Sequence, residues 1–244
     1  MKYIAQIVVA IFLLASRESL AAERITVVAD LWAPYVTVED GKVSGISTDL
    51  VLRALKKADI PYTLRILPWS RAYEMALNEK NILIFTLVRT QERLRKFKWA
   101  ARLHPNVPAF LYGLKSSRIG PINSLQDAKK YSVAAPRSSY SAQRLIASGF
   151  QSQKNFVETK DGETAFKMMI NSRVDLLAEA SSHMDILLKQ SNISPDRVKA
   201  YIQIEDVELY TAFSLKTEDK LVEKFTRAIK AVKTELNRTA PTTE

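Results

Sequence analysis

The alternation of expected strands and helices constrains the fold of this chain more than any other feature. The first block has strand-like runs at 25–30, 62–66 and 82–85, with a helix opening at 47–49 and another at 69–78 between them. The last of these runs, Ile-Leu-Ile-Phe, is continuously apolar, which is typical of a strand buried on both faces of a parallel sheet. This order predicts an α/β unit.

A second block repeats the order. Its strands are expected at 131–135, 155–159 and 174–178, and its helices at 140–148, 162–171 and 181–190. Two such units predict two α/β lobes, joined around 110–118 and 202–208. Ligands of α/β sheets bind beyond the carboxyl ends of the strands, so the two edges are expected to face each other across a cleft.

The end of the chain has a different order. Residues 199–205 and 209–215 are strand-like neighbours, and a long helix is expected at 218–236. Its apolar stripe consists of Leu221, Val222, Phe225, Ala228, Ile229, Val232 and Leu236. A helix with such a stripe is expected to cover a sheet.

The first residues have the pattern of a secretory signal peptide. Lys2 precedes an apolar run from Tyr3 to Ala15, and small residues that suit cleavage follow around Ala21 and Ala22. The run is shorter than the roughly 20 residues of a membrane span. The chain contains no cysteine, which excludes disulfides, thiol chemistry and a cysteine-linked lipid anchor. We therefore expect export to the periplasm as a free protein.

The formal net charge is +10, and the stretch TLVRTQERLRKFKWAAR at 86–102 is strongly basic. Such a run can bind nucleic acid, form a solvated surface or hold one small anion. Export disfavours nucleic acid. Thr90 is a suitable N-cap that places Arg93 in the first turn of a short helix, where free N–H groups and an arginine fork can hold a carboxylate. Arg89 is expected at the edge of the cleft, whereas Arg95, Lys96 and Lys98 are expected in solvent.

Other candidate ligand contacts lie where strands meet helices. Trp69 and Arg71 open the helix at 69–78, and Trp69 is expected either to line a pocket or to pack in the core. Tyr35, near Trp32, occupies a comparable loop. Ser138 and Ser139 lie in a strand-to-helix turn of the second lobe, where they can cap the helix or meet a ligand. The two histidines, His104 in a proline-flanked loop and His183 on a helix, lack metal-binding spacing, and no cofactor motif is present.

Six stretches, in this order and spacing, resemble the bacterial family 3 periplasmic solute-binding proteins, which serve polar amino-acid uptake. They are APYVTVEDGKVSGISTDL, LPWSRAYEMALNEK, RTQERLRKFKWAA, SLQDAKKYSVAAPRSS, NSRVDLL and LYTAFSLKT. The resemblance implies a two-lobed periplasmic-binding-protein fold of type II with hinge-linked lobes and the ligand in the cleft. The implied division is a signal peptide at 1–22, a first lobe at 23–112 and 205–244, and a second lobe at 113–204.

The resemblance also implies roles for individual residues. Arg93 matches the arginine that binds a ligand carboxylate, Tyr35 matches an aromatic side chain that packs on the ligand, and Ser138 and Ser139 match the second lobe's hydroxyl-bearing turn. Two positions depart from the family pattern. Val88 stands where a serine is common. At the position of the aspartate that holds a ligand's amino group the chain has Ala180, with Glu179 beside it. Both departures speak against an ordinary α-amino acid.

We therefore expect a non-enzymatic protein that captures a small carboxylate-bearing solute, an amino acid or a related compound, by hinge closure for uptake or sensing. Its expected partners are this solute and an ABC permease or a sensor domain. We expect a monomer without a cofactor, nucleic acid or membrane insertion. The alternative is an enzyme on the same fold, similar to cyclohexadienyl dehydratases, with Glu179 as the acid.

Overall fold

The computed structural model describes residues 24–239, so the predicted signal peptide at 1–22 lies outside the described residues. The strands are β1 (Ile25–Ala29), β2 (Thr37–Glu39), β3 (Lys42–Ser44), β4 (Tyr62–Ile66), β5 (Ile82–Val88), β6 (Phe97–Leu114), β7 (Val133–Pro136), β8 (Phe156–Thr159), β9 (Leu176–Ala180) and β10 (Val198–Ser214). The α-helices are α2 (Ile46–Lys57), α3 (Trp69–Asn78), α4 (Leu125–Ala128), α5 (Tyr140–Ala147), α6 (Gly162–Ile170), α7 (Ser181–Gln190) and α8 (Asp219–Thr239). A short 3-10 turn, Pro195–Arg197, precedes β10.

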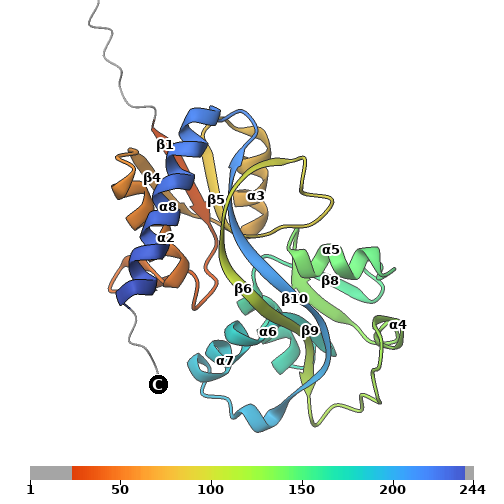
Figure 1. Ribbon diagram of the computed structural model, residues 1–244. Helices are drawn as coiled ribbons and strands as arrows, with labels where there is room; N and C mark the ends of the chain where they lie inside the picture. The colour runs from red at the N-terminus through yellow and green to blue at the C-terminus, as the bar shows by residue number, and fades with distance from the viewer. Residues whose placement is uncertain (1–23, 240–244) are drawn as a thin grey trace, which may run out of the picture.

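One sheet runs through the whole molecule in the order β4-β1-β5-β10-β6-β9-β7-β8. The strands β4, β1 and β5 are parallel to one another, as are β8, β7 and β9. The long antiparallel pair of β10 and β6 lies between these two sets and crosses the middle of the molecule (Figure 1). We call the half with β4, β1, β5, α2, α3 and α8 lobe 1, and the half with β9, β7, β8 and α4 to α7 lobe 2.

The sequence predicted two lobes joined by stretches around 110–118 and 202–208. In the structure the lobes are joined by the long strands β6 and β10 of one continuous sheet. Residues 199–205 and 209–215 belong to one strand, β10, and His104 lies within β6 instead of a loop. The register between β6 and β10 shifts at several points, and such bulges let a paired strand accept Pro105 and Pro108, which lack an N–H donor. The lobe boundaries at 112, 113, 204 and 205 stay a prediction, because these strands run through both lobes.

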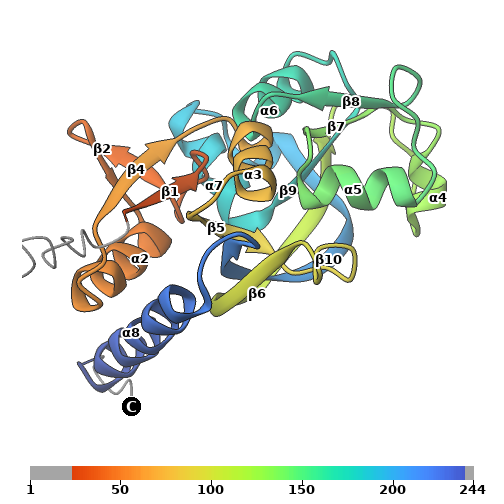
Figure 2. The ribbon, with the colours of Figure 1, turned by 90° about the horizontal axis from the view of Figure 1, so that it is seen from above.

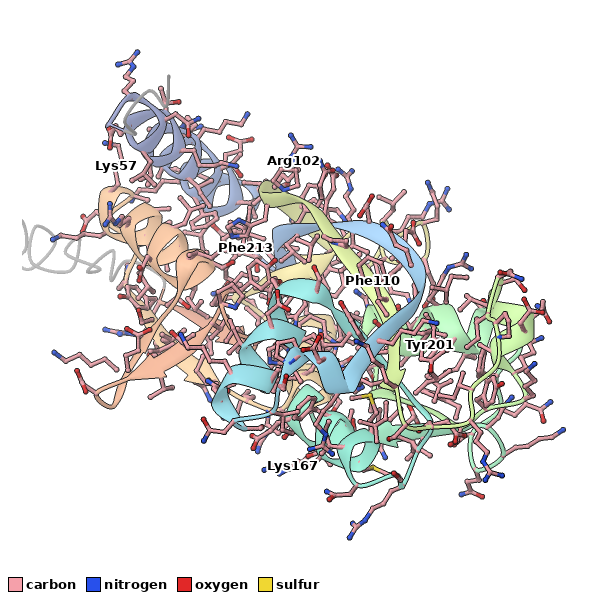
Figure 3. The ribbon with its side chains drawn as sticks, turned by 90° about the horizontal axis from the view of Figure 1, so that it is seen from below. Lys57, Arg102, Phe110, Lys167, Tyr201 and Phe213 are labelled. Carbon is pink, nitrogen blue, oxygen red and sulfur yellow. The ribbon has the colours of Figure 1, made fainter. Side chains whose placement is uncertain are left out.

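Helices cover both faces of the sheet in each lobe. In lobe 1, α2 and α8 pack on one face and α3 packs on the other (Figure 2). Most of the predicted stripe of the last helix is buried here, whereas Leu221 is half-buried and Leu236 is exposed. Phe225 packs against Phe213 of β10 with ring centroids 5.4 Å apart. In lobe 2, α6 and α7 cover one face while α4 and α5 cover the other. Figure 3 shows Phe213 at the lobe 1 end of β10 and Tyr201 at its lobe 2 end.

The start of α2 fixes the loop that follows β1. The sequence predicted that residues 47–49 cap this helix, but the helix begins at Ile46, and Ser47 and Thr48 are buried. Backbone carbonyls of the loop replace a side-chain cap, because the N–H groups of Ser47 and Thr48 both donate to the Tyr35 carbonyl. Gly45 permits this approach at φ 113°, since a Cβ there would lie 2.6 Å from the Tyr35 oxygen.

None of the helices between residues 24 and 239 combines the length and apolar character that crossing a membrane requires.

Candidate ligand-binding site

A small cavity of about 80 Å³ lies between the lobes. It lies beyond the carboxyl ends of β1 and β5 in lobe 1 and of β7 and β9 in lobe 2, which is where α/β sheets bind ligands. The lining residues are Asp30, Leu31, Trp32, Trp69, Thr86, Val88, Arg93, Ala109, Pro136, Ser139, Tyr140, Ser141, Gly162, Ala178, Glu179, Ala180 and Val207. The cavity has space for a few waters or part of a small solute.

Arg93 is the cationic group of this cavity, and its side chain is 0 % exposed. Its Nη1 donates to the Val88 carbonyl in lobe 1 at 3.1 Å, and its Nη2 donates to the Ser138 carbonyl in lobe 2 at 3.1 Å. Within residues 24–239, no acidic side chain forms an ion pair with Arg93, and its Nε has no hydrogen-bond partner. Burial lowers the pKa of Arg93, but a guanidinium stays charged. A buried charge without a counter-ion is costly, and this arrangement leaves Arg93 able to pair with an anion.

The segment that carries Arg93 differs from its predicted form. Residues 91–96 form consecutive turns instead of a short helix. Thr90 still acts locally, because both its carbonyl and its Oγ1 accept from the Arg93 N–H, at 3.0 and 3.3 Å. The guanidinium lies over the Tyr73 ring at 5.0 Å, which supports its position by a cation–π contact. A helix N-terminus therefore does not contribute to anion binding at this place.

Glu179 and His183 form a buried ion pair on the lobe 2 side of the cavity. Their Oε2 and Nδ1 atoms are 3.1 Å apart, and the exposed fractions of the two residues are 5 % and 6 %. The other oxygen of Glu179, Oε1, accepts from Trp32 Nε1 at 3.1 Å and from the Ala180 N–H at 2.8 Å. Burial opposes both charges, but their mutual attraction prevails, so the pKa of Glu179 is lowered and that of His183 is raised. The sequence marked Glu179 as a candidate site residue, whereas His183 was not among the candidates.

Asp30 is a cavity residue that sequence reasoning missed. It directly follows β1, and its position at the carboxyl end of a parallel strand was the signal that could have identified it. The residue is partly exposed, but its carboxyl lies deep among protein atoms, and desolvation raises its pKa to about 7. The nearby His183 lowers this pKa, whereas Glu179 and Asp161 raise it further.

Trp69 and the turn at 138–139 connect the lobes beside the cavity. Trp69 lines the cavity and donates from Nε1 to the Ser138 carbonyl at 2.9 Å. Ser139 also lines it and caps α5, because its Oγ accepts from the Ala142 N–H at 3.1 Å. Ser138 contributes its carbonyl oxygen, which receives both Trp69 and Arg93.

Four residues predicted to contact the ligand lie outside the cavity lining, namely Ser138, described above, and Tyr35, Arg89 and Arg71. Tyr35 is buried behind Trp32, with ring centroids 4.8 Å apart, and its hydroxyl lies 3.1 Å from Ser182 Oγ in lobe 2. Arg89 is exposed, and its guanidinium lies over the rings of Trp99 and Tyr210 at 5.4 and 5.6 Å. Arg71 is exposed on α3. The described residues contain no group of three or more His, Asp or Glu side chains that could hold a metal ion.

Comparisons with known proteins identify the fold class of the chain. No protein-family model matches the chain, and no curated protein matches it. Among solved structures, a histidine kinase sensor domain with similarity to periplasmic binding proteins has a TM-score of 0.77 at 16 % identity, over 88 % of this chain and 92 % of that one. An ancestral arginine-binding protein bound to arginine has a TM-score of 0.75 at 18 % identity, over 87 % and 93 %.

A third solved structure is similar over the same region. The arginine-, lysine-, histidine-binding protein ArtJ from Geobacillus stearothermophilus has a TM-score of 0.75 at 15 % identity, over 89 % of this chain and 92 % of its own. The chain therefore has the two-lobed periplasmic-binding-protein fold, and the predicted fold class is confirmed.

Proposed function

We propose that this chain is a solute-binding protein that captures a small carboxylate-bearing solute, an amino acid or a related compound, between its lobes. The observation that carries the proposal is the fully buried Arg93, which lines the cavity without an acidic partner among the described residues. A carboxylate would supply the missing counter-charge and accept from the free Nε–H. The similar structures of proteins named for arginine, lysine and histidine binding support a solute-binding role.

Capture proceeds by closure of the lobes about β6 and β10. Lining residues come from both lobes, so a solute in the cavity makes contacts that exist only when the lobes are close. Binding then favours the closed form by the differential affinity of the two forms for the solute.

The protein acts in the periplasm after removal of residues 1–22, as a monomer, and presents its closed form to an ABC permease or a sensor domain. The apolar N-terminal run supports export. The similarity to a histidine kinase sensor domain supports a sensing role beside uptake. A nucleic-acid partner is not part of this proposal.

An enzyme of the dehydratase kind is the weaker alternative. A general acid must hold a proton near neutral pH, but the ion pair with His183 lowers the pKa of Glu179 and favours its ionised form. Loss of prephenate or arogenate in the presence of the purified protein is the observation that would establish the alternative.

The test is a binding screen of the mature protein, residues 23–244, against amino acids and other small carboxylic acids by thermal shift, followed by calorimetry. A ligand is expected to raise the melting temperature in a concentration-dependent way. Arg93→Met, which keeps an unbranched side chain for packing, is expected to weaken binding about 10- to 100-fold, because it removes hydrogen bonds between charged groups.

Arg95→Ala is the matched control, because Arg95 is an exposed arginine in the same series of turns. Circular dichroism establishes that each variant is folded. A folded Arg93→Met protein that keeps wild-type affinity for the carboxylate contradicts the proposal, as does a complete absence of binding across the screen.

A further inference from the structure

We propose that Tyr140 determines the length of the solute that the cavity accepts, because its ring lies against the body of the solute, and that Glu205 on β10 holds this ring in place. The inference rests on the proposed function and deepens it. It names a specificity-determining residue and a positioning residue for the same site. The sequence indicated neither of them as a candidate.

Tyr140 stands at the junction of the two lobes. It is the first residue of α5 and lines the cavity. The residue is half-buried, and it packs against an apolar cluster whose members come mainly from lobe 1, although α5 belongs to lobe 2. A tyrosine offers a large contact area and has few rotatable bonds, so ordering it against a solute costs little conformational entropy.

The hydroxyl of Tyr140 is bonded to the strands that join the lobes. It donates to Glu205 Oε2 on β10, and Arg144 Nε, one turn further along α5, lies 3.7 Å from the same oxygen. Glu205 is paired with Ala109 of β6, which lines the cavity. Val207 is two residues further along β10, hence on the same face as Glu205, and it also lines the cavity. The carboxylate of Glu205 therefore holds the Tyr140 ring beside the cavity.

The position of this ring fixes the shape of the cavity wall. A half-buried tyrosine without a partner for its hydroxyl would exchange between staggered side-chain positions. The Glu205 side chain is 50 % exposed, so its bond favours one of these positions by a modest amount. Arg93 lines the cavity from lobe 1 and Tyr140 lines it from lobe 2. A solute whose carboxylate is bound at Arg93 is therefore limited in length by the ring.

The experiment measures how affinity depends on the length of the solute. The mature protein is titrated by calorimetry with alanine, norvaline and norleucine, and with propionate, pentanoate and hexanoate. In each series that binds, Tyr140→Ala is expected to shift the ratio of affinities at least about 10-fold toward the longest member, because the added methylene groups are buried where the ring stood. Binding with an unchanged ratio overturns the inference and leaves the proposed function intact. No binding of any of the six compounds to either protein overturns both.

Tyr201→Ala is the matched control for this substitution. Tyr201 is also a half-buried tyrosine beside lobe 2, but it lies outside the lining of the cavity, with its hydroxyl 3.5 Å from the Leu114 carbonyl oxygen. The ratio of affinities is expected to stay at its wild-type value. Circular dichroism establishes that both variants are folded. An equal shift in both variants overturns the inference, because the shift would then reflect a general loosening of lobe 2.

A second pair of variants tests the positioning role of Glu205. Glu205→Ala keeps the Tyr140 ring but releases it, so the same ratio is expected to shift about 3-fold in the same direction. Glu208→Ala is the matched control, because Glu208 accepts from the Tyr210 hydroxyl at 2.6 Å on the same strand, outside the cavity lining, and no shift is expected. In the Tyr140→Ala background, Glu205→Ala is expected to change nothing further. An unchanged ratio in the single variant, or a further shift in the double variant, overturns the role of Glu205.

Discussion

Asp30 connects the chemistry of the cavity to the stability of the fold. In the folded protein it holds its proton up to a pH of about 7, because burial raises its pKa from 3.8 to that value. In the unfolded chain the same carboxyl loses its proton near its ordinary pKa of about 3.9. Between these two values the folded state binds more protons than the unfolded state, so this group's contribution to stability falls as the pH rises.

The raised pKa of Asp30 can be tested by comparing the stability of the wild type with that of Asp30→Asn, whose amide cannot ionise. From pH 4.5 to 7.5 the free energy of unfolding of the wild type is expected to fall relative to that of the variant by on the order of 2 kcal/mol. Because Asp30 is partly exposed to water, this change in the free energy of unfolding is smaller than it would be for a completely buried carboxyl. Denaturant titrations at several pH values measure the difference, with Asp49→Asn, which changes an exposed carboxyl on α2, as the baseline. A relative stability that rises or stays flat over this range contradicts the raised pKa.

Some cavity residues could be predicted from the sequence and others could not, for physical reasons. Arg93, Trp69, Ser139 and Glu179 stand at ends of predicted strands or starts of predicted helices, and the structure places all four in the cavity lining. Arg89 stands in a similar position in the sequence, but its side chain turns outward over two aromatic rings. Side-chain direction in a turn depends on tertiary neighbours, which spacing along the chain does not specify.

At the scale of elements, α8 stabilises lobe 1 through its apolar stripe. Phe225 is 0 % exposed and packs edge-on against Phe213. Phe225→Ala is expected to lower the free energy of unfolding by about 3 to 5 kcal/mol, through lost burial and the cavity left behind. Denaturant unfolding measures this loss. Arg227→Ala, an exposed position two residues further along α8, is expected to change it by less than about 0.5 kcal/mol. A loss below about 1 kcal/mol for Phe225→Ala would mean that α8 is not a structural part of the lobe.

Short elements were predicted more accurately than the longest ones. The strand at 82–85 and the helices at 69–78 and 181–190 all have local signals, and the structure contains each of them. No local signal indicated that β6 is one long strand or that the strand-like runs at 199–205 and 209–215 join into the single strand β10. The pairing of β6 with β10 spans residues about a hundred positions apart, and it turns two predicted sheets into one continuous sheet.

At the scale of the whole molecule, the lobes are joined across the cavity by the protein's own side chains. Trp32 Nε1 donates to Glu179 Oε1 at 3.1 Å, and the hydroxyls of Tyr35 and Ser182 lie 3.1 Å apart. Trp69 Nε1 adds a bond to the Ser138 carbonyl at 2.9 Å. These contacts favour the closed form in the absence of a solute. They therefore reduce the binding energy that a solute must supply for closure.

The substitution Trp32→Phe tests how far these contacts favour the closed form, because it removes the donor to Glu179 and keeps an aromatic ring. A hydrogen bond to a charged group contributes about 1.5 to 3 kcal/mol, so the ratio of open to closed protein is expected to rise about 10- to 100-fold. Because the chain has no cysteine, Lys57→Cys and Lys167→Cys introduce two unique labelling sites, one on each lobe (Figure 3). Single-molecule energy transfer between them measures the distribution of lobe separations.

Trp99→Phe is the matched control, because the Trp99 indole donates to the Leu94 carbonyl within lobe 1 at 3.1 Å and does not touch lobe 2. Its distribution of separations is expected to match that of the parent. The Trp32→Phe protein is expected to show more of the wide separation, and a saturating solute is expected to reverse the change. If the two variants give the same distribution, the bond between Trp32 and Glu179 does not hold the lobes together, and closure must depend on the solute alone.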